Sequence, residues 1–531
     1  MAGPLLVVNA SLPGRFSVED DPPHPPAGSI AVVAGRIAAV GDLAGCRAAA
    51  GPGATELDAG GGSVLPGFID AHAHLLSLGE ALDVLDLRGL PGPDAVVRAT
   101  ARHAARTGPG AWVIGRGWTP AGAQDNHLLS QAVPRRPVLL NRFDHHGALV
   151  NAEALRRAGI GPGTPDPPGG RILRDAAGQP TGVLLETAAD LVRARIPPHG
   201  PADRRRLMRA AAAHCLSLGL TGLHDAIDDL AWIDDVRALL DGREHLPRIF
   251  GMVRAPAAGD LHEFAGDVLT RPRDPRFDLQ RLRVVFDGGL GARGALFDEP
   301  YHDDPGNTGL QMMSEARLRE AADAVLAHGR GLCVHAIGDR ANRTVLDILE
   351  PALAGRDADH RFVIEHATVV APPDVPRLAR LGLIASVQPA HLHRAIGYLT
   401  DRLGPERARN AYAFRDLLSA GVRLALGTDF PVAPPDPLGT LHAAETRQTL
   451  DGAPPGGLFP DQRLTRAETV RGATYEGAHM ARREHDLGAV SPGGTADLVI
   501  FDRDLFTLDA AELPTARVRY TVLDGEVVHA A

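Results

Sequence analysis

The sequence predicts an α/β protein: a (β/α)8, TIM-like barrel with a small β-sandwich domain composed of both termini. Three observations lead to this prediction. Short apolar segments alternate with helical patterns through the middle of the chain, short strands with hairpin turns occur at both ends, and metal-capable side chains follow several apolar segments. A length of 531 residues and a hydrophobic content of 44% suffice for a large core.

Both ends of the chain carry short strands separated by turn residues. Residues 30–40 indicate two apolar strands around a Gly turn, and residues 496–501 and 518–528 repeat the pattern, with a turn at Asp524-Gly525. We therefore expect residues 1–64 and 485–531 to form the two parts of one β-sandwich.

Between the termini, apolar strands are spaced as in parallel βα units. The eight strands are predicted at residues 65–70, 219–225, 248–253, 282–287, 332–336, 362–365, 384–388 and 422–426. Helices with one apolar face lie between strands, and two of them are expected to begin at the caps Ser314 and Asp339. A catalytic barrel over residues 65–484 accommodates this order.

The stretch from about residue 80 to 200 is too long for a single βα unit. We expect an insertion in the barrel, which serves either as a substrate-binding lid over the mouth or as a passive excursion.

Composition excludes several classes of partner. The net charge is -10 and no basic block occurs, so nucleic acid is not an expected partner. No apolar run reaches the roughly 18 residues of a membrane span, and the first residues lack a basic leader and a cleavage site. The three cysteines are widely spaced, which indicates neither a disulfide framework nor a thiolate metal site. A cytoplasmic location is expected.

The pair His72-Ala-His74 follows the apolar run that begins at Leu65. Side chains alternate along a strand, so both imidazoles point to the same side, as a metal chelate requires. Imidazole nitrogen suits zinc and neighbouring divalent ions. The alternative is a pair of solvated histidines at a strand end.

Further metal-capable residues stand at the ends of later predicted strands: His335, His366 and Asp429. In a parallel barrel the strands finish at one rim, where ligands that are distant in sequence converge. The sequence therefore predicts a metal site formed by these three residues and the His-x-His pair.

An ordered series of motifs resembles the amidohydrolase superfamily, and within it the YtcJ-like branch of amidohydrolase family 3, over nearly the whole chain. The motifs are Leu65-Pro-Gly-Phe-Ile-Asp-Ala-His-Ala-His74, Gly115-Arg-Gly-Trp118, Asp144-His-His146 with Val150-Asn151, Asp287-Gly-Gly-Leu-Gly-Ala-Arg-Gly-Ala-Leu296, His335-Ala-Ile-Gly-Asp-Arg340, Ile364-Glu-His-Ala367, Gly427-Thr-Asp429 and Gly493-Gly-Thr-Ala-Asp-Leu498. The resemblance implies a metal-dependent hydrolase whose barrel holds one or two divalent ions on the five residues named above. It also implies a homodimer.

One position departs from this resemblance. The relatives carry a lysine four residues before Asp287, and its carboxylated amine bridges two metals; here the position is Arg283, and all 55 basic residues of the chain are arginine. A guanidinium is permanently cationic and cannot form that bridge. Two dications about 4 Å apart repel by several kcal/mol even at an effective dielectric near 20, so a second ion is disfavoured. We therefore expect one ion, Zn²⁺ with Fe²⁺ or Mn²⁺ as alternatives, held by His72, His74, His335 and Asp429, with no carboxylated lysine.

These residues predict hydrolysis by a metal-activated water. Asp429 is expected to carry the proton from water to the leaving amine, and His366 or Arg293 to stabilise the oxyanion. The alternatives are a helix cap for Asp429 and a loop salt bridge for Arg293. Substrate contacts are expected from a set of residues that otherwise would serve packing or the lid: Trp118, Phe143, His145, His146, Asn151, Arg283 and Asp287.

The predicted reaction is cleavage of a non-peptide C–N bond in a small amide, formamide or cyclic amide. A metal-dependent deaminase is the nearest competing reaction, although related deaminases resemble one another in a glutamate three residues after the fifth-strand histidine, where this chain has Gly338. The residues also allow a non-hydrolytic enzyme or a non-catalytic barrel of the same family.

Overall fold

The structure is a computed structural model that describes residues 3–12, 28–106, 108, 110–119, 125–142, 146–356 and 359–531. The chain divides into two compact units, one formed by Met1–Ser77 with Met208–Ala531 and the other by Leu78–Leu207. The first unit contains the barrel and both terminal sheets.

The barrel is a parallel sheet of eight strands in the order β19-β18-β17-β16-β15-β14-β13-β6. Its strands are β6 (Phe68–Ala73), β13 (Leu220–Ile227), β14 (Arg248–Arg254), β15 (Phe277–Val285), β16 (Gly331–Ala336), β17 (Val363–His366), β18 (Ile384–Val387) and β19 (Arg423–Leu426). A parallel bridge between Ala73 and Phe430 brings the first strand to the end of the last. The predicted (β/α)8 barrel is confirmed.

Small and branched side chains fill the barrel interior. One buried layer takes a residue from seven of the eight strands and adds Met480, its members being Ala71, Ala226, Met252, Cys333, Val363, Ile384, Ala425 and Met480. Strands buried on both faces need such near-continuous apolar runs, which explains why the sequence pattern identified them.

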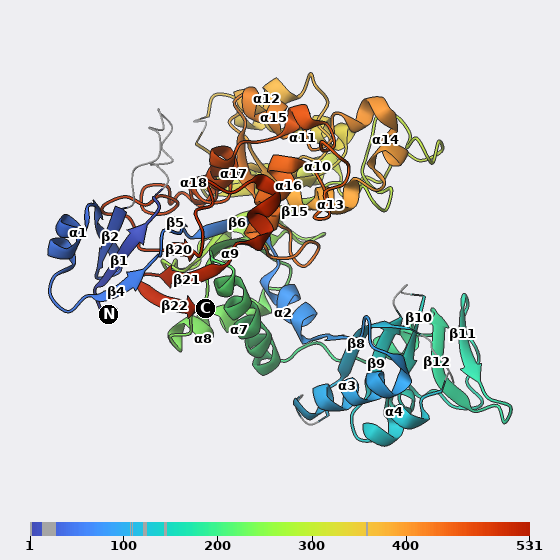
Figure 1. Ribbon diagram of the computed structural model, residues 1–531. Coiled ribbons are helices and arrows are strands. Elements are labelled where there is room, and N and C mark those ends of the chain that lie inside the picture. Colours follow the sequence, from blue (N-terminus) through green and yellow to red (C-terminus); the bar gives the residue numbers. More distant parts are fainter. Residues whose placement is uncertain are drawn as a thin grey trace. The chain divides into compact units, whose positions relative to one another are not determined.

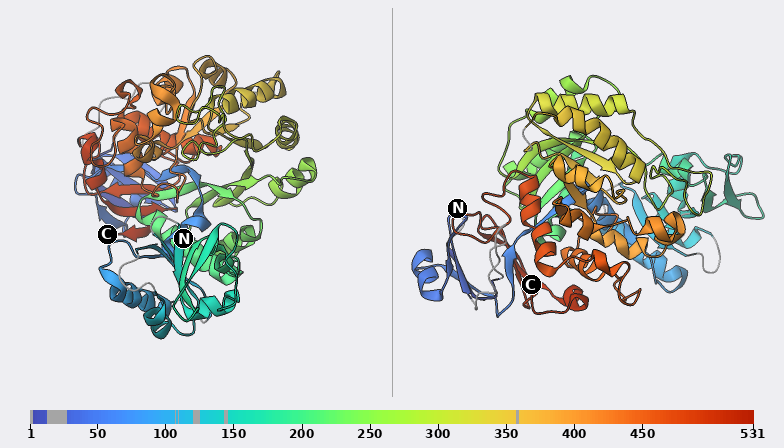
Figure 2. Two further views of the ribbon diagram at one scale, coloured as in Figure 1. Left: turned by 90° about the vertical axis from the view of Figure 1, so that its right-hand side faces the viewer. Right: turned by 90° about the horizontal axis from the view of Figure 1, so that it is seen from above.

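Helices cover the outside of the barrel, as the green-to-orange ribbons show (Figures 1 and 2). They are α7 (Pro201–Ser217), α8 (Ala231–Asp241), α9 (Leu261–Leu269), α10 (Glu315–Ala327), α11 (Asp339–Leu353), α12 (Val375–Arg380), α13 (Leu392–Ala395), α14 (Leu399–Ala408), α15 (Phe414–Ser419), α16 (Pro437–Thr446), α17 (Arg466–Gly472) and α18 (Tyr475–Met480). Short 3-10 turns occur at η1 (Pro389–His391), η2 (Pro460–Gln462) and η3 (Ala510–Thr515).

The two predicted helix caps had different outcomes. Ser314 caps α10, where its side chain accepts a hydrogen bond from the Arg317 amide. The prediction that Asp339 caps α11 is wrong, because the cap is Gly338 and Asp339 is the first helical residue. A side chain at position 338 would collide with the Leu296 carbonyl, at 2.0 Å from a Cβ, so this turn requires glycine.

Both ends of the chain build two four-stranded sheets in the same unit, seen as blue and red strands side by side (Figures 1 and 2). The first sheet contains β1 (Leu5–Ala10), β2 (Gly28–Val33), β3 (Arg36–Gly41) and β4 (Thr55–Asp58), with α1 (Leu43–Ala50) beside it. The second contains β5 (Val64–Pro66), β20 (Leu498–Phe501), β21 (Val518–Leu523) and β22 (Glu526–Ala530). Apolar residues of both sheets share one core.

The second unit has its own mixed sheet, in the order β11-β12-β10-β9-β8-β7, and its own apolar clusters. Its strands are β7 (Leu85–Asp86), β8 (Val113–Trp118), β9 (Val138–Arg142), β10 (Gly147–Val150), β11 (Gly170–Arg174) and β12 (Pro180–Glu186). Its helices are α3 (Gly92–Arg106), α4 (His127–Ala132), α5 (Ala152–Ala158) and α6 (Asp190–Arg193), and α2 (Leu75–Asp83) leads into it. This unit, Leu78–Leu207, spans the stretch from about residue 80 to 200, for which an insertion and its lid role stay predictions.

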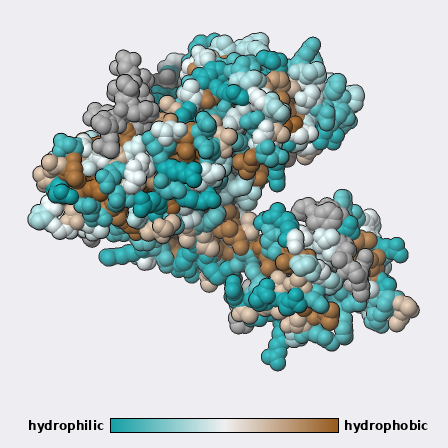
Figure 3. Space-filling view, in the orientation of Figure 1, coloured by the Kyte–Doolittle hydropathy of each residue, from teal (hydrophilic) through white to brown (hydrophobic). Residues whose placement is uncertain are grey.

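The face of the molecule in Figure 3 is mostly hydrophilic, with apolar residues scattered among polar ones. Within the described ranges, no helix is both long enough and apolar enough to cross a bilayer.

Candidate metal centre

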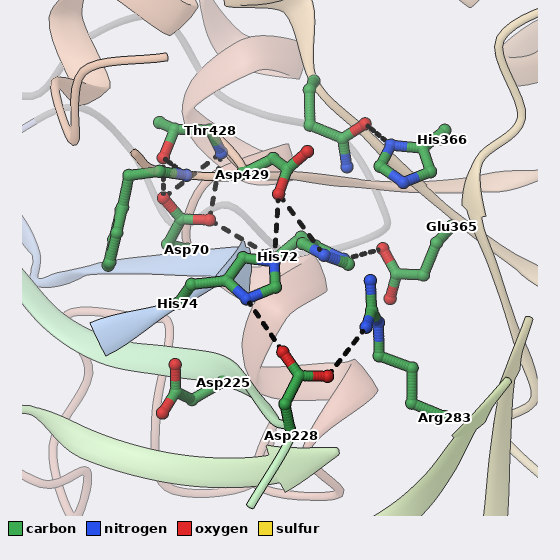
Figure 4. Close-up of polar contacts among 12 residues, drawn as sticks. Asp70, His72, His74, Asp225, Asp228, Arg283, Glu365, His366, Thr428 and Asp429 are labelled. Atoms are coloured by element: carbon green, nitrogen blue, oxygen red, sulfur yellow. Dashed lines mark hydrogen bonds and ion pairs between the residues drawn. The ribbon is translucent and has the colours of Figure 1, made fainter. Parts of the chain in front are cut away.

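Three residues that the sequence singled out meet where the barrel closes (Figure 4). The Nε2 atoms of His72 and His74 lie 3.5 and 3.2 Å from Oδ1 of Asp429. One ligand atom from each of the three lies within 4.8 Å of the others. His72 and His74 come from β6 and the residue after it, and Asp429 follows β19, so the strand-end argument brought this group together.

Glu365 orients His72. The His72 Nδ1 lies 2.6 Å from Oε2 of Glu365, whose Oε1 accepts a hydrogen bond from the Cys333 thiol at 2.9 Å. Burial raises the pKa of the Glu365 carboxyl, but the His72 charge and these hydrogen bonds outweigh it and lower the pKa to about 2. The ionised carboxylate therefore accepts the Nδ1 proton, and Nε2 is the ring nitrogen that faces Asp429.

No hydrogen-bond partner in the described part of the chain satisfies Nε2 of His72, although this atom is buried. A buried ring nitrogen without a hydrogen-bond partner is costly unless a ligand occupies the space beside it. Two imidazoles and one carboxylate are also the donor types that zinc and similar ions take in catalytic sites. These residues therefore fit a divalent ion.

A second group shares Asp429. It consists of His366, His391 and Asp429, with His391 Nε2 3.8 Å from Oδ2 of Asp429. The His366 Nδ1 lies 2.7 Å from Oε1 of Gln388, so its Nε2 also faces away as a free lone pair. Burial lowers the pKa of His366 to about 4 and lowers that of His391, which keeps both rings neutral near pH 7.

Sequence reasoning missed His391, Glu365 and Gln388. Gln388 ends the strand predicted at 384–388, and His391 lies in the turn directly after it, in η1. The strand-end rule applied to the residues beyond this strand could have identified His391. Glu365 had no comparable signal, because its side chain acts through His72.

His335 lies beside these groups but belongs to neither. Its ring centroid is 4.5 Å from that of His366, and its Nε2 faces Oδ1 of Asp287 at 3.7 Å. Burial lowers the pKa of His335 well below its usual range, and the Arg283 charge lowers it further. Its role as a metal ligand stays a prediction.

Asp287 and Arg293 are engaged by other groups. The Asp287 carboxylate accepts hydrogen bonds from the backbone amides of Leu296, Ile337 and Gly338, each at 2.9 Å. Arg293 pairs with Asp303 at 2.9 Å, which is the loop salt bridge considered as the alternative to oxyanion binding. The substrate role of Asp287 and the oxyanion role of Arg293 stay predictions.

Arg283 extends from β15 to the same site (Figure 4). The residue is 7% exposed, and its Nη1 lies 3.6 Å from Oδ1 of Asp228. The other carboxylate oxygen of Asp228 is 4.0 Å from Nδ1 of His74. The residue that replaces the expected lysine thus lies close to the metal-capable group.

The remaining substrate candidates belong to the second unit. Trp118 is buried in an apolar cluster of that unit, and His146 pairs with Glu186 at 2.9 Å. Asn151 caps α5 and also accepts a hydrogen bond from the Val138 amide. Phe143 and His145 lie outside the described residues. Contact of these residues with substrate stays a prediction.

Comparison with known proteins shows which family the chain belongs to. Residues 55–529 match the model of the amidohydrolase family, and the chain belongs to this family. It is 32% identical to the protein named YtcJ of Bacillus subtilis strain 168 over 496 residues, covering 90% of this chain and 91% of that protein. It is 30% identical to the N-substituted formamide deformylase of Arthrobacter pascens over 519 residues, covering 94% of each.

Among solved structures, an uncharacterized metal-dependent hydrolase from Pyrococcus furiosus matches with a TM-score of 0.76 and 27% identity, over 95% of this chain and all of that one. The resemblance that the motifs indicated is confirmed. Family and structure together identify a hydrolase for small molecules whose His and Asp groups suit a divalent metal.

Proposed function

We propose that the chain hydrolyses a non-peptide C–N bond, in an amide, formamide or cyclic amide, with water activated by one divalent ion, Zn²⁺ in the first instance. The observation that carries the proposal is the convergence of His72, His74 and Asp429 with the buried, unsatisfied Nε2 of His72. The likeness to a formamide deformylase supports the C–N bond as the target.

His72, His74 and Asp429 would hold the ion, and His335 is the fourth ligand that we expect. A bound divalent ion supplies an acidified water, with a pKa near 7, and polarises the scissile carbonyl. His366 then faces the substrate, with its Nδ1 fixed by Gln388.

Asp429 is placed to move the proton. Its Oδ1 faces the His72 and His74 pair, whereas Oδ2 faces His391. Burial raises the pKa of Asp429, but the charge of His72 and the hydrogen bond from His74 lower it well below its usual range, so the carboxylate is ionised. In the proposed reaction it accepts the proton of the attacking water. Returning that proton to the leaving nitrogen completes hydrolysis and is worth about 10² to 10⁴ in rate.

The test is to reconstitute the metal-free protein with Zn²⁺, Fe²⁺ or Mn²⁺, count ions per chain by mass spectrometry, and assay formamides, N-acyl amines and cyclic ureas. We expect one tightly held ion, release of a carboxylate with an amine, and loss of both ion and turnover in His74→Ala. His485→Ala, at an exposed histidine, is the matched control.

Two ions per chain at full activity would contradict the single-ion proposal. Release of ammonia from a ring amine would identify a deaminase instead, and full turnover without any metal would overturn the mechanism.

A further inference from the structure

Arg283 is a buried cation with an unsatisfied donor, its Nε. A guanidinium has five N–H donors, and buried ones are normally satisfied. Among the described residues, none satisfies the Nε of Arg283, which is buried. Arg281, two residues earlier on β15, shows the contrast, because it donates to the Arg361 and Met480 carbonyls and to Gln280.

The nearest carboxylate neutralises Arg283 only in part. Asp228 lies 3.6 Å from Arg283, is half exposed, and also pairs with Arg254 at 3.4 Å. Two guanidinium groups therefore share one carboxylate on this side of the site. An ion pair at that distance and exposure is weak, since water screens it.

The other ionised carboxylates of the site are committed elsewhere. Glu365 is bound by His72 and Cys333, and Asp429 faces the histidine pair. Asp287 is occupied by three backbone amides. Among the described residues, none of these three carboxylates therefore completes the hydrogen bonds of the Arg283 guanidinium.

We infer that the substrate carries a carboxylate, which binds the Arg283 guanidinium while the scissile C–N group lies at His72, His74 and Asp429. This inference rests on the proposed function and narrows its substrate class to amides or cyclic amides of amino acids and similar acids. The planar fork of arginine matches a carboxylate in two parallel charge-assisted hydrogen bonds, which a neutral amide cannot reproduce. An uncharged substrate would leave the buried cation unpaired during catalysis.

The first test compares pairs of substrates that differ only in charge. One pair is N-formylalanine and N-formylalaninamide; the other two replace the formyl group by an acetyl or a carbamoyl group. We expect kcat/KM to favour the acid by about 100-fold, and Arg283→Gln to remove most of this preference while the ion content stays at one. Arg319→Gln, in an exposed helix pair, is the control that keeps the preference.

A binding measurement separates this inference from the proposed function. Succinate is titrated calorimetrically into the zinc-loaded protein, and we expect Arg283→Gln to weaken its binding by about 10-fold or more. Asp228→Asn removes the competing carboxylate and should strengthen succinate binding.

If Arg283→Gln hydrolyses both members of a pair as the unaltered protein does, or binds succinate equally well, the inference is overturned while hydrolysis stands. If succinate binding depends on Arg283 but no amide is hydrolysed, the carboxylate site stands and the proposed function fails.

Discussion

Glu365 shows how one residue outside the metal-capable group can set its chemistry. Its carboxylate fixes the proton on Nδ1 of His72 and so determines that Nε2 faces Asp429. Removing such a partner typically weakens metal binding 10- to 100-fold.

For Glu365→Gln we therefore expect zinc affinity to fall about 10- to 100-fold, because a neutral amide holds the His72 tautomer less firmly. Competition with a chromophoric chelator measures this change, and circular dichroism checks the fold. Glu350→Gln, in a surface pair with Arg380, is the control. An unchanged zinc affinity would show that Glu365 does not orient His72.

Arg283 allows a direct test of the single-ion prediction. Arg283→Lys restores the amine that can be carboxylated, so in bicarbonate and excess zinc we expect the ion count to rise from one to two. Arg319→Lys should leave the count at one. A count of one in both variants would mean that the missing lysine is not what limits the site.

The sequence could predict those site residues that lie directly at strand ends. His72, His74 and Asp429 were found in this way, because alternation and barrel topology constrain where such side chains go. His391 lies one turn beyond its strand, and Glu365 acts through a neighbour, so no periodicity marks either. The unsatisfied Nε of Arg283 depends on the packing of several strands, which only coordinates reveal.

At the scale of elements, the seam between β6 and β19 positions the centre. Asp70 accepts hydrogen bonds from the Thr428 amide and hydroxyl and from the His72 amide, and the Asp429 amide donates to the His72 carbonyl at 2.8 Å. These hydrogen bonds fix β6, the first barrel strand, against the residues that follow β19, the last one. The His72 and His74 side chains therefore lie next to Asp429.

Gly427 makes this seam possible. A Cβ there would lie 2.6 Å from both Oδ1 of Asp70 and the His72 nitrogen. Gly427→Ala is expected to cost about 1–3 kcal/mol of unfolding free energy and to weaken metal binding. Urea denaturation measures the first effect, with Gly306→Ala, where nothing lies within 4 Å, as the control. Equal stability of the two variants would contradict the close packing of Gly427 against Asp70 and the His72 backbone.

The element pattern of the barrel was predictable because buried parallel strands are apolar and evenly spaced. The α11 cap was not, since the close approach of the Leu296 backbone to Gly338 is a tertiary contact. The sheet of the second unit was also missed, because its strands are short and its sequence was interpreted only as an insertion.

For the whole molecule, a buried ion network joins the barrel to the terminal sheets. Arg248 at the start of β14 donates to Asp497 at 2.6 and 3.0 Å and also pairs with Asp524, which in turn binds Arg276. Arg248 is 2% exposed, so the loss of its charge would leave the buried Asp497 carboxylate without its cation.

Arg248→Gln is expected to lower the unfolding free energy by about 3–5 kcal/mol, the usual cost of breaking a buried pair. Arg47→Gln removes an exposed pair with Glu56 and should cost no more than about 1 kcal/mol. Denaturant titration of both variants measures the difference, and similar values would show that the Arg248 network contributes little.

The arrangement of the terminal sheets constrains how the protein is made. β5 precedes the barrel, yet its sheet partner is β20, which the ribosome synthesises after every barrel strand. During translation the β5 edge stays unpaired for most of synthesis, while His72 and His74, which follow it in the sequence, have already left the exit tunnel. The sheet that contains β5 can therefore form only after the last part of the chain has been synthesised. Until then β5, which directly precedes the first barrel strand β6, has no sheet partner.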